Sequence, residues 1–145
     1  MVNVQTVADY FLTLVDEESG DNISHLKLQK LLYYAQGFHL AIHRTRLFDE
    51  CIEAWAHGPV VRKLYHKYSK YGAGAIPQPE APDFSSLSDE HKELLDDVFN
   101  VYGAFSGWKL RNMTHDEPPW KETQPKKVIS DDRMKEYFQT QLCDE

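Results

Sequence analysis

The sequence has little of what marks a secreted, membrane-spanning or disulfide-linked protein. Its 145 residues include only two cysteines, Cys51 and Cys143, which lie far apart and form no Cys-x-x-Cys motif. No apolar run approaches the roughly 20 residues that a membrane-spanning helix needs. The first residues also lack the basic start and apolar stretch of a signal peptide. We therefore expect a cytoplasmic protein with reduced thiols and no membrane partner.

Positive charge is absent from the start of the chain and concentrated in its middle. Residues 1–23 hold five acidic residues and no Lys or Arg. Residues 24–72 hold eight Lys or Arg against three acids, whereas residues 73–145 hold eight against fifteen, and the net charge is −7. An acidic protein is poorly suited to non-specific nucleic-acid binding, because phosphate affinity depends on Lys and Arg. The basic middle segment is instead suited to an acidic protein partner.

What the chain does have is the composition of a globular domain, with 41% hydrophobic and 12% aromatic residues. A chain of 145 residues is large enough for one core, so we predict a single domain over residues 1–145. Periodicity and capping residues favour helices over residues 6–17, 26–43, 59–72, 88–102, 106–115 and 130–142. We thus predict a mainly α-helical fold of five or six helices, with room for one small β-hairpin between Phe48 and Trp55.

The segment 26–43 is predicted to be a central helix. On a helical wheel its apolar stripe comprises Leu28, Leu31, Leu32, Ala35, Phe38 and Ile42. Only Lys30 and Gly37 mark its back, so other elements are expected to surround it, and Gly37 suggests that another backbone packs closely there. Tyr33 and Tyr34 on its flanks lie either in the core or in an interface, because tyrosine suits both.

The helix expected after Pro59 has a basic face, which is one candidate contact for a partner. Its basic positions are Arg62, Lys63, His66, Lys67 and Lys70, with no acidic residue among them. We select Arg62, Lys63 and Lys67 as candidate partner-binding residues, because a cationic surface attracts an acidic one. The alternative is a solvated face that the protein's own acidic segments balance.

The junction from Trp55 to Pro59 is a second candidate contact. Trp55 is followed by His57, by Gly58, which permits unusual backbone angles, and by Pro59, which is favoured at the first position of a helix. One interpretation is a structural corner that places Trp55 in the core. In the other, the corner presents His57 and free helix N–H groups to a partner.

Histidines form the pattern that comes nearest to a catalytic or metal site. His39 and His43 have the i, i+4 spacing of a shared metal site, but no third ligand follows at a suitable spacing. We therefore expect His39 to be a hydrogen-bonded core residue and His115 to stabilise a helix C-terminus. No nucleophile motif or glycine-rich phosphate loop accompanies them. The residues thus predict a soluble helical binding domain without enzymatic activity, cofactor or metal, and leave its oligomeric state open.

Two long sequence blocks carry a resemblance to a known family. They are LKLQKLLYYAQGFHL over residues 26–40 and IEAWAHGPVVRKLY over residues 52–65, with Leu47-Phe48-Asp49-Glu50 between them. The closing pattern comprises Trp108, residues 110–115 and Pro119-Trp120. Over residues 24–120 the chain resembles the Panacea family of SocA-like antitoxin domains, which includes phage-associated GepA-like proteins.

The resemblance implies an antitoxin that neutralises a cognate protein toxin by direct contact. Its candidate interface comprises Tyr33, Tyr34, Trp55, His57, Gly58, Pro59, Arg62, Lys63 and Lys67. One alternative is a phage-associated adaptor that presents a client protein to a protease. Another is a metal-dependent hydrolase that uses His39, His43 and His115.

Overall fold

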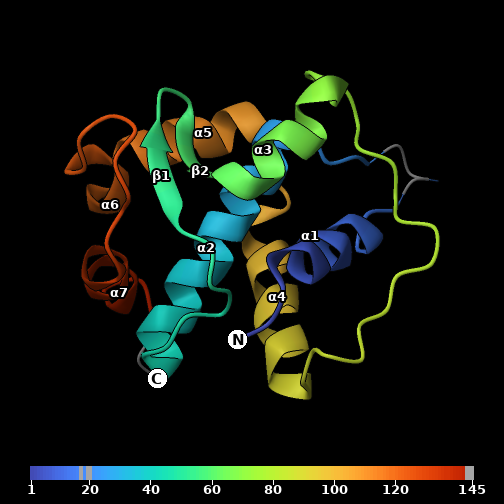
Figure 1. The fold of residues 1–145 in the computed structure, drawn as a ribbon, viewed down its shortest axis with the longest axis horizontal. Coiled ribbons are helices and arrows are strands. Elements are labelled where there is room, and N and C mark those ends of the chain that lie inside the picture. Colours follow the sequence, from blue (N-terminus) through green and yellow to red (C-terminus); the bar gives the residue numbers. More distant parts are fainter. Residues whose placement is uncertain (17, 19–20, 143–145) are drawn as a thin grey trace.

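Helices account for most of the structure, a computed structural model that describes residues 1–16, 18 and 21–142 (Figure 1). In chain order the elements are α1 (Val4–Thr13), α2 (His25–His43), β1 (Ile52–Trp55), β2 (Gly58–Val61), α3 (Arg62–Tyr68), the 3-10 helix η2 (Ser69–Tyr71), α4 (Asp89–Tyr102), α5 (Gly107–His115), α6 (Pro118–Lys121) and α7 (Asp131–Gln139). The predicted mainly α-helical fold with one small hairpin is confirmed, and the single turn α6 was not predicted. Within the described ranges, no helix is long and apolar enough to cross a membrane.

Short polar side chains set where the helices start. The hydroxyl groups that accept a hydrogen bond from a backbone N–H of the first turn belong to Ser24, Ser88, Ser106 and Ser130. Asn3 caps α1 in the same way, so this helix begins before the predicted residue 6. The predicted end of that helix, Glu17, lies outside the described residues. Of the two cysteines, Cys51 is exposed and Cys143 also lies outside the described residues.

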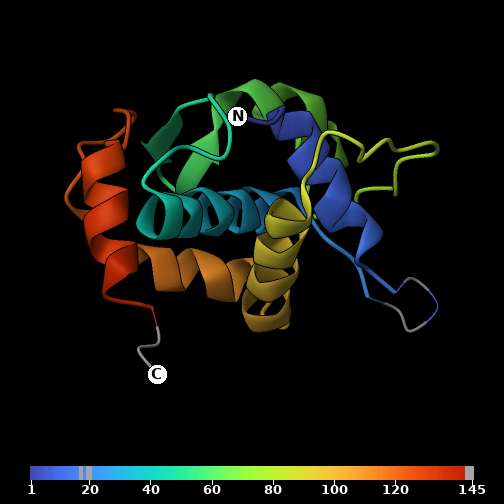
Figure 2. The same cartoon turned by 90° about the horizontal axis from the view of Figure 1, so that it is seen from below.

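Helix α2 is the centre of the fold, as predicted. Seen from below (Figure 2), it lies between α5 and the segment from β1 to α3, and α4 and α7 pack across it. The stripe residues that are completely buried are Leu28, Leu31, Leu32 and Ala35. The predicted stripe is wrong in the last turn, where Ile42 is 47% exposed. The loop after α2 folds back onto His39 instead, whose Nδ1 lies 2.6 Å from the carbonyl oxygen of Thr45.

Gly37 makes room for an aromatic ring of α7 and not, as predicted, for another backbone. A Cβ atom at position 37 would lie 2.1 Å from Cε2 of Phe138. The Phe138 ring also packs against Tyr33 and Phe38, with ring centroids 5.3 and 4.9 Å apart. Glycine in the middle of α2 therefore lets α7 approach the central helix closely, in spite of its low helix propensity.

The hairpin lies later in the chain than predicted. Strands β1 and β2 pair antiparallel, with Ile52 opposite Val61 and Trp55 opposite Gly58. The prediction that Pro59 starts a helix is thus wrong, since residues 58–61 form β2 and α3 begins only at Arg62. The side chain of Gln29 in α2 explains part of this outcome, because its Oε1 accepts a hydrogen bond from Val61 N at 2.8 Å and holds β2 against the central helix.

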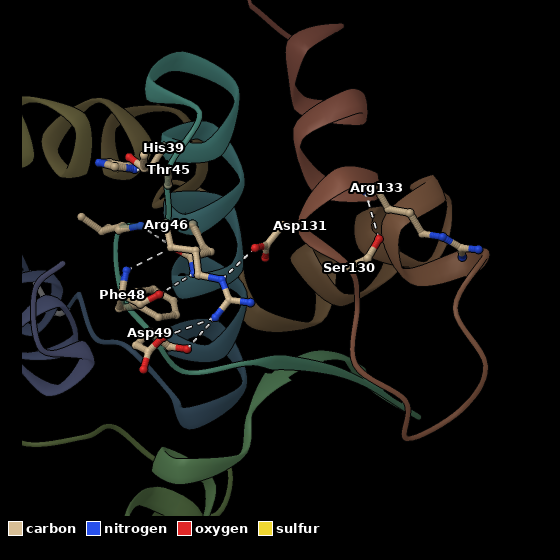
Figure 3. Close-up of polar contacts among 10 residues, drawn as sticks. His39, Thr45, Arg46, Phe48, Asp49, Ser130, Asp131 and Arg133 are labelled. Carbon is tan, nitrogen blue, oxygen red and sulfur yellow. Dashed lines mark hydrogen bonds and ion pairs between the residues drawn. The ribbon is translucent and has the colours of Figure 1, made fainter.

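The loop between α2 and β1 is fastened to the core by side chains that sequence patterns do not reveal. Gln36 Oε1 accepts hydrogen bonds from the backbone nitrogens of Leu47 and Phe48, at 2.8 and 3.2 Å. Figure 3 shows how Arg46 in the same loop reaches Asp131 in the first turn of α7. The Nε–Oδ2 distance of this ion pair is 2.8 Å. The loop therefore joins the C-terminal end of α2 to α7.

We expect Leu31→Ala to lower the free energy of unfolding by about 2–5 kcal/mol, the usual range for truncation of a buried leucine. Leu31 is completely buried in α2, and the truncation would leave a cavity in the core. Ile42→Ala, at an exposed position of the same helix, serves as the control and should cost much less. Urea unfolding measures both variants. Equal losses would mean that α2 does not carry the core.

Candidate functional site

The turn between β1 and β2 covers a buried lysine. Gly58 has a φ of 108° in this turn, and a Cβ there would lie 2.6 Å from Cε of Lys30. Lys30 is 0% exposed, and its Nζ donates a hydrogen bond to the carbonyl oxygen of Pro59 at 3.1 Å. Burial, together with the positive charge of Arg111, lowers the pKa of Lys30 to about 7. Helical periodicity had placed this lysine on the back of α2, and the nearly apolar wheel was the only sign that it is buried.

A pocket of about 510 Å³ opens beside the same corner. Its aromatic lining residues are Trp55, Tyr65 and Trp108, and the polar ones include His25, Gln29, Lys30 and His57. In the described part of the chain, neither aspartate nor glutamate lines it. Burial and the charge of Lys30 lower the pKa of His25 to about 4, so this histidine is neutral at pH 7. The pocket thus combines apolar and aromatic walls with a few polar groups, an arrangement that can bind an apolar side chain.

The predicted corner residues divide between the surface and the interior. His57 is exposed and Trp55 is half-buried, so both are accessible to a partner. Gly58 and Pro59 are buried, and the inference that they present free helix N–H groups is wrong because they belong to a strand. Trp55 O accepts a hydrogen bond from Trp120 Nε1 at 2.8 Å, so the corner is also fixed from α6.

The basic face of α3 is exposed, and neighbouring residues balance part of its charge. Arg62, Lys63 and Lys67 are all exposed to solvent. Lys63 forms an ion pair with Glu50 at 3.1 Å, and Lys67 Nζ donates a hydrogen bond to Gln5 Oε1 at 2.7 Å. For Lys63, the ion pair fits the alternative in which the protein's own acidic residues balance the basic face. Of the three selected residues, Arg62 therefore has most freedom to contact a partner.

Tyr33 and Tyr34 are core residues, so their selection as surface contacts is corrected. Both are 0% exposed. Their hydroxyl groups donate hydrogen bonds to the two carboxyl oxygens of Glu117, at 3.0 and 2.8 Å. Burial raises the pKa of Glu117 to about 7. The hydrogen bonds from the tyrosine hydroxyl groups act in the opposite direction, because they favour the charged form. Tyrosines on two sides of α2 thus hold one buried carboxyl group.

We expect Glu117 to make the protein less stable as the pH rises from 4.5 to 7. In the unfolded chain its pKa is near 4.5, whereas the folded protein keeps the proton up to about pH 7. The folded state therefore binds more protons in this window, and stability falls with pH by on the order of 3 kcal/mol. Glu117→Gln should remove that slope. Urea unfolding of both proteins at pH 4.5 and 7.5 measures it, and parallel profiles would contradict the shifted pKa.

A second pocket, of about 640 Å³, contains the histidines that raised the metal hypothesis. His39, His43 and His91 line it together with Met1, Arg46 and Glu90, among others. The rings of His39 and His43 lie 4.7 Å apart, but in the described part of the chain no three His, Cys, Asp or Glu side chains are placed to hold a metal ion. His115 does not line this pocket and stacks on Trp120 at 4.0 Å.

Comparison with known proteins places the chain in a family. The family described as antitoxin SocA-like, Panacea domain, matches residues 28–121, which run from the first turn of α2 to the end of α6 and include the corner, Lys30 and most of the pocket lining. The chain belongs to this family of SocA-like antitoxin domains. Neither the curated proteins nor the solved structures include a significant match.

Proposed function

We propose that this protein is an antitoxin that neutralises a partner toxin by direct protein contact in the cytoplasm. The observation that carries the proposal is membership of the SocA-like antitoxin family over residues 28–121. An exposed surface with aromatic and cationic residues, around Trp55 and His57, supports a binding role, since such residues are enriched in protein interfaces. The protein then acts by occupying its partner and not by catalysis.

Co-expression tests this function. The product of the gene beside this one is produced in a bacterial host, with and without the antitoxin. We expect growth arrest by the neighbouring protein alone, rescue on co-expression, and a stable complex of the two purified proteins. A neighbouring protein that is harmless, or toxicity that persists although both proteins are made, would contradict the proposal. Recovery of a protease in the complex would favour the adaptor instead.

The basic face of α3 is proposed to speed association with this toxin. Reversing Arg62, Lys63 and Lys67 to glutamate should slow association by about tenfold at low salt, because steering depends on complementary charge. The difference should shrink as salt is added. Rapid-mixing kinetics at two salt concentrations measure it.

A matched control separates this local effect from that of net charge. Reversal of Lys121, Lys126 and Lys127, three exposed lysines outside α3, changes the net charge by the same amount. This control should leave the association rate much closer to that of the unmodified protein. Equal slowing by both triple variants would mean that overall charge, and not the basic face, determines the rate.

A further inference from the structure

The guanidinium group of an arginine stacks on the ring of an exposed tryptophan in α5. Trp108 is 56% exposed, although it is among the largest apolar side chains of the protein. The guanidinium carbon of Arg111, one turn later in the helix, lies 4.4 Å from the centre of this ring. Arg111 Nε donates a hydrogen bond to Nδ1 of His57 at 3.1 Å, which links α5 to the β1–β2 turn. The three side chains thus form one surface cluster across two elements.

This cluster forms the rim of the apolar pocket. Trp108 and His57 both line the pocket, and Arg111 lies at its edge because it stacks on Trp108. Trp55 and Tyr65, with ring centroids 4.7 Å apart, belong to the opposite part of the lining. A tryptophan and an arginine beside a concave apolar surface are the residues that most often dominate the energy of protein interfaces.

The positive charge of this cluster has no acidic partner among the residues that the structure describes. Among the described residues, ion pairs form at Arg46 and Lys63, and neither Arg111 nor Lys30 takes part in one. The polar partners of Arg111 are His57 and Asn112, and that of Lys30 is the carbonyl oxygen of Pro59. A cation at the rim without a carboxylate, the guanidinium group of Arg111, favours an occupant that brings its own negative charge.

We propose that the pocket between Trp55, Tyr65 and Trp108 docks a segment of the partner protein in which an apolar side chain is flanked by a carboxylate. The apolar side chain enters the pocket, and the carboxylate pairs with the guanidinium group of Arg111 on its exposed side. That the partner is a toxin rests on the proposed function. The chemistry of the segment follows from the pocket alone.

Selection from a random 12-residue peptide library displayed on phage tests the docking site without any toxin. We expect the intact protein to enrich peptides with Phe, Trp, Leu or Ile within two positions of Asp or Glu. Binding of the synthesised peptides, followed by fluorescence anisotropy, should weaken at least about tenfold in Trp108→Ala. Arg111→Gln should remove the preference for acidic over amidated peptides of the same sequence.

Further variants separate the site from effects on folding. Ala73→Trp fills the pocket from an exposed lining position and should also abolish binding. Lys109→Gln removes a cation from the same helix at a position that does not line the pocket, and should change binding less than about twofold. Thermal melting verifies that each variant is folded.

The outcomes that overturn the proposal are specific. They are failure to enrich any peptide, enrichment without an acidic consensus, and binding by Trp108→Ala or Ala73→Trp that equals binding by the unmodified protein. Binding of a labelled 12-nucleotide single strand that is lost in the same variants, without peptide enrichment, would assign the site to nucleic acid. Rescue from the toxin that is unaffected by Trp108→Ala and Arg111→Gln would refute this docking site and leave the antitoxin function standing.

Discussion

Lys30→Met is expected to change the pH dependence of stability between pH 7 and 10. In the unfolded chain the pKa of this lysine is 10.5, whereas the folded protein releases the proton near pH 7. The unfolded state therefore binds more protons in this window, so the stability of the unmodified protein rises with pH. Between pH 6.5 and 9.5 we expect its free energy of unfolding to rise by about 3 kcal/mol relative to that of Lys30→Met.

Methionine is unbranched and only one atom shorter than lysine, so the pH dependence of the comparison reports the charge. Met fills most of the space of Lys30 beneath the β1–β2 turn but leaves the carbonyl oxygen of Pro59 without its donor, at a cost that does not depend on pH. Lys121→Met, at an exposed position of α6, is the control and should leave the slope unchanged. Urea unfolding at four pH values measures all three proteins. Profiles for Lys30→Met that run parallel to the unmodified protein would contradict the lowered pKa.

Phe138→Ala is expected to lower the free energy of unfolding by about 3–5 kcal/mol, as for other buried phenylalanines. Phe138 is completely buried, and its ring fills the space above Gly37 and beside Tyr33. Helix α7 lies beyond the residues that match the family, 28–121. A loss of this size would make α7 an integral part of the core. Val101→Ala, at a 58% exposed site, is the control and should cost little.

A double-mutant cycle tests the contact between α2 and α7 directly. Gly37→Ala in the intact protein should cost about 1–3 kcal/mol, because the added methyl group meets the Phe138 ring. In the Phe138→Ala background that space is empty, and alanine gains about 1 kcal/mol of helix propensity over glycine. The same substitution should then be neutral or stabilising. An equal cost in both backgrounds would mean that the close approach of α7 does not require glycine.

Local sequence signals determined most of the helices. Serine caps and apolar periodicity depend on residues within a turn or two, and Ser24, Ser88, Ser106 and Ser130 cap helices that begin close to the predicted ranges. The central position of α2 also follows from its sequence, because a helix with so little polar surface has to be covered on most sides. The family resemblance over residues 24–120 rested on contiguous blocks of sequence in the same way and is confirmed over residues 28–121.

Only the tertiary structure decided the chemistry of the candidate site. Pro59 lies in a strand because β1 pairs with β2 and because Gln29 of α2, 32 positions before Val61, accepts a hydrogen bond from the backbone of β2. Lys30 is buried because the β1–β2 turn closes over it, and nothing in its local sequence shows that turn. Trp108 meets the corner only through packing of α5 against β2. These features depend on contacts between residues tens of positions apart, which helical periodicity and capping patterns do not encode.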